Sequence, residues 1–307
     1  MKYRFVWAAV GLLVACDSSP AEPRCGSGAE CPSGVCLATG QCLETDGSAP
    51  DGSPADAGIE AAVDAPFDTS LDAPPGTCTP DQNGRIERAE IVIQTGTTVR
   101  WAAQQNLPVD TAGTTGAQGR SWDFSAAPGD RDLDLTPTPL EGQWFADSFP
   151  SATYAIRLAD ASDLLGVFQL TDQSLLLRGI VSPTDGASRT EAVYDPPVVV
   201  LAFPIEEGAT FQTDARVTGV VNGLPVNYRE RYESAVDARG EATTPFATFP
   251  VLRVRTLLTR TVGFVDTEVR QFSFITECFG TVATVVSEDD EPTVEFSRAS
   301  ELRRMGI

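Results

Sequence analysis

The fold follows from TFQTDARVTGVVNGLPVNYRERYESAV, residues 210–236, in which apolar and polar residues alternate on both sides of an Asn-Gly pair. Alternation with a period of two is typical of a β-strand that buries one face. The pair Asn222-Gly223 is typical of a tight hairpin. We therefore expect this pair to join two antiparallel strands, one around Val217 and the other around Tyr228.

The same alternation recurs over residues 77–307, a segment rich in Val, Thr, Phe, Ile and Leu and punctuated by Gly, Pro, Asn and Asp. The expected strands cover residues 98–102, 154–158, 164–170, 175–181, 198–203, 210–221, 226–236, 251–262, 267–275, 281–287 and 294–299. Helical periodicity is scarce. The segment therefore predicts an all-β domain, built as a strongly curved antiparallel sheet of barrel or half-barrel shape, with a two-layer sandwich as the second choice.

The seven cysteines divide into three groups with none left over. One group is a tight cluster: Cys25, Cys31, Cys36 and Cys42. Its spacing, with Pro and Gly between the cysteines, predicts a small disulfide knot of two bridges whose pairing stays open. Zinc is a poorer match, because zinc sites use closer pairs and often histidine. Two distant cysteines, Cys78 and Cys278, would clamp the start of the domain to one of its last strands if they pair.

Residues 44–76 separate this knot from the β-rich domain. They consist almost wholly of Asp, Ala, Pro, Gly, Ser and Thr, with no Lys or Arg. Low hydrophobicity with charge of one sign predicts a disordered acidic linker. We expect a stalk, with a specific recognition tail as the alternative.

The N-terminus carries the features of an export signal. Lys2 and Arg4 precede a short apolar run, residues 5–14, that is too short to span a bilayer as a helix. The run ends in Leu13-Val14-Ala15-Cys16, which resembles the lipobox of bacterial lipoprotein precursors. The alternative is an ordinary secretory signal in which this cysteine is incidental.

The lipobox resemblance implies that residues 1–15 are a cleaved signal peptide and that Cys16 is acylated, anchoring the mature chain in a membrane. The four-cysteine module, residues 16–43 with the lipidated N-terminus, resembles short cysteine-rich modules of envelope lipoproteins. We expect the cell envelope, with the outer membrane or cell surface favoured. Asp17 keeps the inner membrane open, because an aspartate there resembles a retention signal in some sorting systems.

Two motifs resemble an uncharacterised β-rich domain of exported bacterial proteins. They are GRSWDFS at residues 119–125 and TTPFATFPVLRV at residues 243–254, where Ala247 replaces the usual glycine. The resemblance implies a β-fold and an envelope setting. It supplies no catalytic residues.

The composition removes most enzyme classes. The chain has no histidine, and its single lysine, Lys2, is lost with the signal. Catalysis by a Ser-His-Asp triad, histidine-bound metals and lysine Schiff bases are therefore excluded. A glycoside hydrolase with two carboxylates remains as the alternative, but no acidic pair stands out, and we expect no enzyme.

The net charge of -21 opposes binding to nucleic acid or anionic lipid, because both need a basic patch. The nearest basic residues alternate along expected strands: Arg229, Arg231, Arg253 and Arg255. Since Glu230 and Glu233 lie beside the first two, we expect charges on solvated strand faces, paired with neighbouring acids.

One segment, residues 79–90, resembles a calcium loop of the EF-hand type, although Thr79 stands where an aspartate is expected. The candidate calcium ligands are Asp81, Asn83, Arg85, Glu87 and Glu90, and no other cofactor is expected. The alternative is an Asn-Gly turn leading from Cys78 into the first strand. A second acidic run, Asp130, Asp132 and Asp134, is expected to be an exposed loop.

These features favour a lipid-anchored envelope lipoprotein whose β-domain is non-catalytic and binds a protein, a glycan or a small apolar ligand. The alternatives are the carboxylate hydrolase and a purely structural envelope component. Three tryptophans are candidates for a sugar site, although a tryptophan in a β-domain is more often core: Trp101, Trp122 and Trp144.

Overall fold

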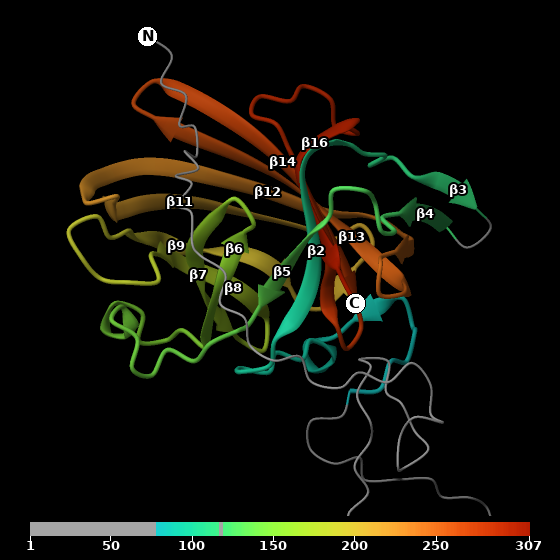
Figure 1. Ribbon diagram of the computed structural model, residues 1–307, viewed down its shortest axis with the longest axis horizontal. Coiled ribbons are helices and arrows are strands. Elements are labelled where there is room, and N and C mark those ends of the chain that lie inside the picture. Colours follow the sequence, from blue (N-terminus) through green and yellow to red (C-terminus); the bar gives the residue numbers. More distant parts are fainter. Residues whose placement is uncertain (1–77, 117–118) are drawn as a thin grey trace, which may run out of the picture. The chain divides into compact units, whose positions relative to one another are not determined.

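The computed structural model describes residues 78–116 and 119–307. These residues form an all-β domain with no α-helix, built on a curved, nearly closed antiparallel sheet (Figure 1). The predicted fold class is therefore confirmed. The expected signal peptide, Cys16, the cysteines of the knot (Cys25, Cys31, Cys36 and Cys42) and the linker lie outside the described residues.

Sixteen strands and two short 3₁₀ turns follow one another along the described chain. The strands are β1 (Arg85–Ile86), β2 (Val99–Pro108), β3 (Thr114–Gly116), β4 (Gly119–Asp123), β5 (Arg131–Leu135), β6 (Tyr154–Ala159), β7 (Ser162–Leu170), β8 (Ser174–Val181), β9 (Glu191–Ala202), β10 (Ile205–Glu206), β11 (Thr210–Val221), β12 (Leu224–Thr243), β13 (Thr248–Val262), β14 (Val265–Thr276), β15 (Gly280–Ser287) and β16 (Arg298–Met305). The 3₁₀ turns are η2 (Arg88–Glu90) and η3 (Ala146–Ser148).

The main sheet runs in the order β5-β2-β16-β15-β14-β13-β12-β11-β9-β8-β7-β6. Its two ends come together: Thr138, just after β5, exchanges backbone hydrogen bonds of 2.8 and 2.9 Å with Ala155 in β6. This bridge almost closes the sheet on itself, so the two-layer sandwich is not the arrangement observed. The small strands β1 and β10 form a separate pair.

The hairpin predicted from the Asn-Gly pair is present. Val221 lies opposite Leu224, and Val217 lies opposite Tyr228. Asn222 and Gly223 have φ angles of 51° and 75°, the left-handed conformation that such a two-residue turn requires. β11 has the predicted bounds.

Several strands extend beyond their predicted bounds, and irregular alternation is the reason. In β12 a bulge between Val236 and Ala238 moves the following residues to the opposite face. The apolar alternation after the bulge is therefore shifted by one residue relative to the alternation before it. β16 covers Arg298–Met305 rather than 294–299, because its buried charged residues mask the apolar pattern. The expected exposed loop at Asp130, Asp132 and Asp134 is wrong for the last two, which are exposed but lie in β5; Asp130 immediately precedes this strand. Leu133 and Leu135 alternate with the acids and are buried.

Two hydrophobic cores lie on opposite faces of the central strands. The inner core is formed by residues of β6–β9 and β11–β14, which follow one another in the sheet order. Tyr154 in β6 and Ile275 in β14 lie at opposite ends of this run, and the curvature of the sheet brings them into one cluster on its concave side. The outer core lies where β4 runs parallel to β12. There Trp122 and Phe124 each place their rings 5.0 Å from the ring of Phe274. Gly240 permits this approach, since a Cβ at this position would lie 1.8 Å from the carbonyl oxygen of Arg120.

A disulfide joins Cys78 to Cys278 across a sequence separation of 200. Cys278 lies in the turn between β14 and β15 rather than in a late strand. The bridge therefore links the start of the described domain to the turn between β14 and β15.

Candidate functional site

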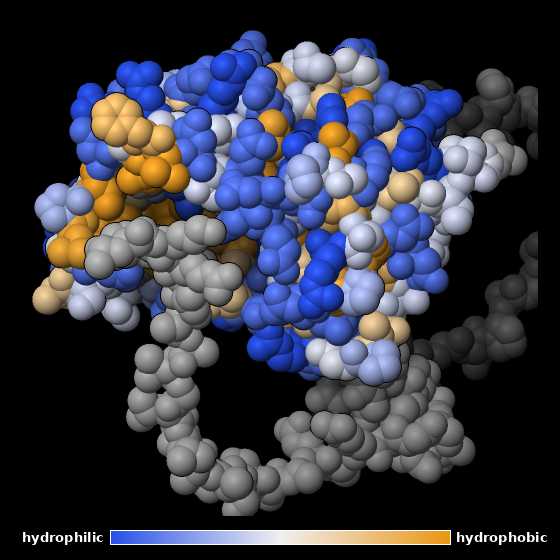
Figure 2. All heavy atoms as spheres, turned by 90° about the horizontal axis from the view of Figure 1, so that it is seen from above, coloured by the Kyte–Doolittle hydropathy of each residue, from blue (hydrophilic) through white to orange (hydrophobic). Residues whose placement is uncertain are grey.

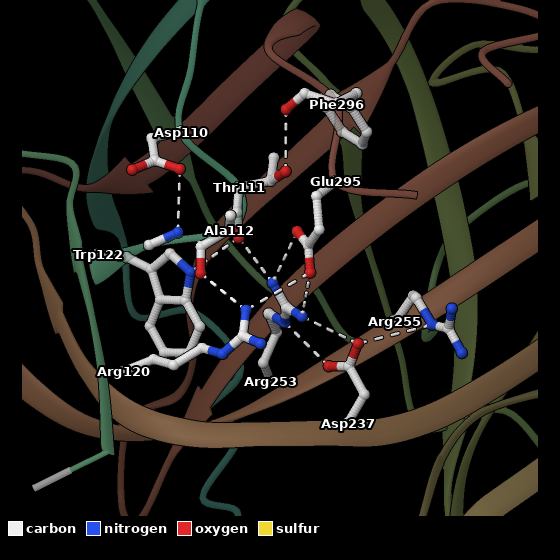
Figure 3. Close-up of polar contacts among 11 residues, drawn as sticks. Asp110, Thr111, Ala112, Arg120, Trp122, Asp237, Arg253, Arg255, Glu295 and Phe296 are labelled. Carbon is white, nitrogen blue, oxygen red and sulfur yellow. Dashed lines mark hydrogen bonds and ion pairs between the residues drawn. The ribbon is translucent and has the colours of Figure 1, made fainter. Parts of the chain in front are cut away.

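The best-bonded charged side chain of the described domain is Arg253, which comes from β13 and points into the outer core (Figure 3). Only 1% of this residue is exposed, so the expectation of a solvated strand face is wrong. The guanidinium donates two hydrogen bonds of 2.9 Å to Asp237 and two of 2.8 and 3.2 Å to Glu295. It also donates one of 2.6 Å to the carbonyl oxygen of Thr111.

Aromatic rings enclose the same guanidinium. Its central carbon lies 4.3 Å from the ring centre of Phe272 and 5.3 Å from that of Trp122. Burial works to lower the pKa of Arg253, but the hydrogen bonds to Glu295 and Asp237 outweigh it and raise the pKa above its ordinary value. The arginine therefore stays charged and holds three chain segments on the outer face.

The paired carboxylates around Arg253 bear on the hydrolase alternative. Asp237 and Glu295 both bind the guanidinium of Arg253, which lies between the two carboxylates. Both carboxylates of this pair are thus occupied by hydrogen bonds from the same arginine. This cluster is therefore a structural fastening.

A second fastening uses Arg304, which is fully buried in β16. It donates to both carboxylate oxygens of Asp130, at 2.5 and 2.6 Å, and to the carbonyl oxygen of Phe124 at 2.8 Å. Asp130 thus serves the packing of the outer segment and does not act together with Asp132 and Asp134.

On the concave side, Glu230 is a buried acid with 1% of its surface exposed. It accepts a 2.6 Å hydrogen bond from Arg260 and one of 2.5 Å from the hydroxyl of Tyr232, whose ring lies 6.5 Å from that of Tyr194. Burial raises the pKa of both phenols well above the ordinary value, and the Glu230 carboxylate raises them further. Both tyrosines therefore remain protonated. The expectation that Glu230 pairs with Arg229 or Arg231 on a solvated face is wrong.

The tips of two adjacent hairpins present bare apolar side chains. The exposed fractions are 69% for Leu224 on the β11–β12 turn, and 55%, 107% and 67% for Val262, Phe264 and Val265 on the β13–β14 turn. Both tips point to the left in Figure 1, and apolar surface gathers on the same side in Figure 2. We call these four residues the apolar tips.

An open cavity of about 360 Å³ adjoins the second tip. The residues that line it come from β11, β12, the end of β13 and the β13–β14 turn: Arg216, Asn227, Tyr228, Arg229, Thr261 and Gly263. Arg216 and Arg229 lie directly opposite each other in the ladder. Sequence reasoning singled out Arg229 but not Arg216, because the pairing of the two strands decides which charges meet.

The structure brings together only part of the expected calcium site. Oxygens of Asp81, Glu90 and Glu277 lie within 4.8 Å of one another, and Glu87 is not part of this acidic group. Of the other expected ligands, Asn83 donates from its side-chain amide to Asp81 at 2.8 Å, and Arg85 pairs with Glu87 at 2.8 Å. Asn83 and Gly84 bend directly into β1, and a 3₁₀ turn stands where an EF-hand has its exiting helix. Glu277 was missed because the Cys78–Cys278 disulfide, and not local spacing, brings it close. Calcium binding stays a prediction.

The three candidate tryptophans do not form a sugar-binding surface together. Trp122 is 1% exposed in the outer core, where its indole donates to the Thr111 carbonyl oxygen at 2.9 Å. Trp101 packs beside β5, and Trp144 packs near Phe145 in another cluster. They therefore serve separate parts of the core.

Comparison of the chain with protein-family models, curated proteins and solved structures finds no match. In residues 78–116 and 119–307, no helix has the length and apolarity needed to cross a bilayer.

Proposed function

We propose that the chain is a lipid-anchored cell-envelope lipoprotein whose β-domain is a non-catalytic binding module, and that this module binds an apolar surface of its partner through the apolar tips. The observation that carries the proposal is the exposure of Leu224, Val262, Phe264 and Val265 on two neighbouring hairpins. Turns normally favour Gly, Asn, Asp, Ser and Pro. The four apolar residues at these tips keep more than half of their surface exposed after folding, and a clustered apolar surface of this kind is typical of a contact with a partner.

The chemistry of the tips favours an apolar partner over a glycan. Three of the four side chains are aliphatic, and the fourth is phenylalanine, so none of them donates or accepts a hydrogen bond. Fully burying a Val, Leu or Phe side chain contributes roughly 1.5–3 kcal/mol, so an apolar partner that covers the four tips gains a favourable term that a glycan cannot match.

The binding role is tested by photocrosslinking in cells. A benzoylphenylalanine replacing Phe264 is expected to give a defined crosslinked product, because its side chain would lie in the contact. The same residue replacing Gln212, which is exposed on β11 away from the tips, is the matched control and is expected to give none. Equal crosslinking at both positions, or none at Phe264, contradicts binding through the tips and favours the structural alternative.

The anchor has its own test. Replacing Cys16 by serine is expected to release the protein from membranes, since acylation needs the cysteine sulfur. Partition between detergent and aqueous phases measures the change, with Cys78→Ser as a control that should leave partition unaltered. Continued recovery of the Cys16→Ser protein in the detergent phase contradicts the lipoprotein hypothesis.

A further inference from the structure

We infer that Arg216 and Arg229 form a binding site for an oxyanion, that is, a phosphate, sulfate or carboxylate group. The two arginines are cross-strand partners on β11 and β12 and line the cavity of about 360 Å³. Like charges directly opposite each other destabilise a sheet unless a counter-charge lies between them. The inference concerns the cavity and does not rest on the function proposed for the apolar tips.

The bonding of the two arginines leaves their guanidinium groups largely free. The side chain of Arg229 makes no hydrogen bond or ion pair with any residue of the described parts of the chain, and the side chain of Arg216 donates only to the side-chain oxygen of Asn227, at 3.0 Å. By contrast Arg231, the next outward-facing residue of β12, donates to Glu233 at 3.0 Å and lies 4.0 Å from Asp214. Of the two neighbouring arginines of β12, Arg231 is therefore paired with acids, whereas the Arg229 side chain has no partner in the described residues.

The acids on the neighbouring strands do not supply a counter-charge to Arg216 and Arg229. Asp195 lies opposite Arg216 on β9, but no ion pair joins them. Asp266 lies beyond Thr261 on β14 and accepts the hydrogen bond of the Thr261 hydroxyl at 2.6 Å. Neither carboxylate is among the residues that line the cavity, whereas both arginines are.

The donors define the chemical class of the ligand. A guanidinium presents a planar fork of N–H groups that matches two oxygens of a carboxylate or phosphate. Asn227 keeps its amide N–H groups available, because its bond to Arg216 uses only the oxygen. The cavity is larger than a small inorganic ion, and Gly263 in its lining leads into the second apolar tip. An anionic group carried by a larger molecule fits this arrangement.

The test is thermal unfolding of the full chain carrying Cys16→Ser, in millimolar phosphate and in chloride of equal ionic strength. Phosphate is expected to raise the Tm by about 2–4 °C, as a ligand bound to the folded state does. Arg229→Gln is expected to abolish this rise and, by removing the repulsion, to raise the Tm in chloride by about 1–2 °C. Arg231→Gln, the matched control, should keep the phosphate response.

The outcomes separate clearly. A Tm that phosphate leaves unchanged, or raises equally in the parent and in Arg229→Gln, overturns the site. Arg216→Gln provides a second variant and is expected to lose the response as well. Cosedimentation with phosphatidylglycerol vesicles, but not with phosphatidylcholine vesicles, would assign the anion to a lipid headgroup if Arg229→Gln also abolishes it. A phosphate response without cosedimentation assigns it to a soluble molecule.

Discussion

Arg253→Met is expected to lower the free energy of unfolding by about 3–5 kcal/mol, because it removes the buried counter-charge of Asp237 and Glu295. Each of these carboxylates keeps only a more exposed arginine at 3.6 Å, Arg255 beside Asp237 and Arg120 beside Glu295. The methionine preserves much of the side-chain volume, so the loss reports on charge and hydrogen bonding more than on a cavity. It also removes the stacking of the guanidinium between Trp122 and Phe272. Urea unfolding followed by tryptophan fluorescence measures the change.

Arg255→Met is the matched control for this prediction. Arg255 lies 3.6 Å from the same Asp237, but 39% of its side chain is exposed. Ion pairs at such sites contribute at most about 1 kcal/mol, so its loss should be small. A similar loss for both variants would show that Asp237 alone, and not the enclosed arginine, stabilises the outer face.

Replacing Cys78 and Cys278 together by serine is expected to cost up to about 5 kcal/mol of unfolding free energy. The disulfide closes a loop with a sequence separation of 200, and in the chain-entropy model so long a loop strongly restricts the unfolded chain. The midpoint of urea unfolding should fall, with a larger m-value because the unfolded chain becomes more expanded.

The double serine variant is more informative than reduction, since a reductant also acts on any disulfide of the N-terminal cysteines. Cys25→Ser is the control and should leave the unfolding midpoint of the β-domain unchanged. A loss below about 1 kcal/mol in the double variant would contradict the loop-closure argument. Peptide mapping under non-reducing conditions that found both thiols free would exclude the bridge itself.

Local alternation was sufficient to predict the class of fold and most of the strands. The pattern of residues 210–236 predicted the hairpin and its two-residue turn, with strands around Val217 and Tyr228, and the structure places these two residues opposite each other. Such features depend on residues within one or two strands, so a single sequence contains them. The bulge at Val236/Ala238 and the buried charges of β16 interrupted the alternation and shifted the expected bounds.

The candidate sites depended on contacts that sequence spacing does not encode. Arg253 and Arg255 look alike in an alternating strand, yet only Arg253 is covered, because the Thr111 carbonyl oxygen reaches it across a separation of 142 residues. In the same way the curvature of the sheet buries Glu230, and the disulfide brings Glu277 beside Asp81.

There is a physical reason why the strands could be predicted from the sequence and the candidate sites could not. A strand and its turn are selected by the local preference of each residue for an extended or turning backbone and by burial of every second side chain. Which of two equivalent charges is covered, and which pair of arginines meets across a cavity, is decided only when strands distant in the sequence pack around one curved sheet. For this chain the sequence by itself was enough to predict the strands, the grouping of the cysteines and a membrane anchor. The packing of distant strands around the curved sheet decided that Arg253 is enclosed, that the apolar tips lie together and that Arg216 lies opposite Arg229.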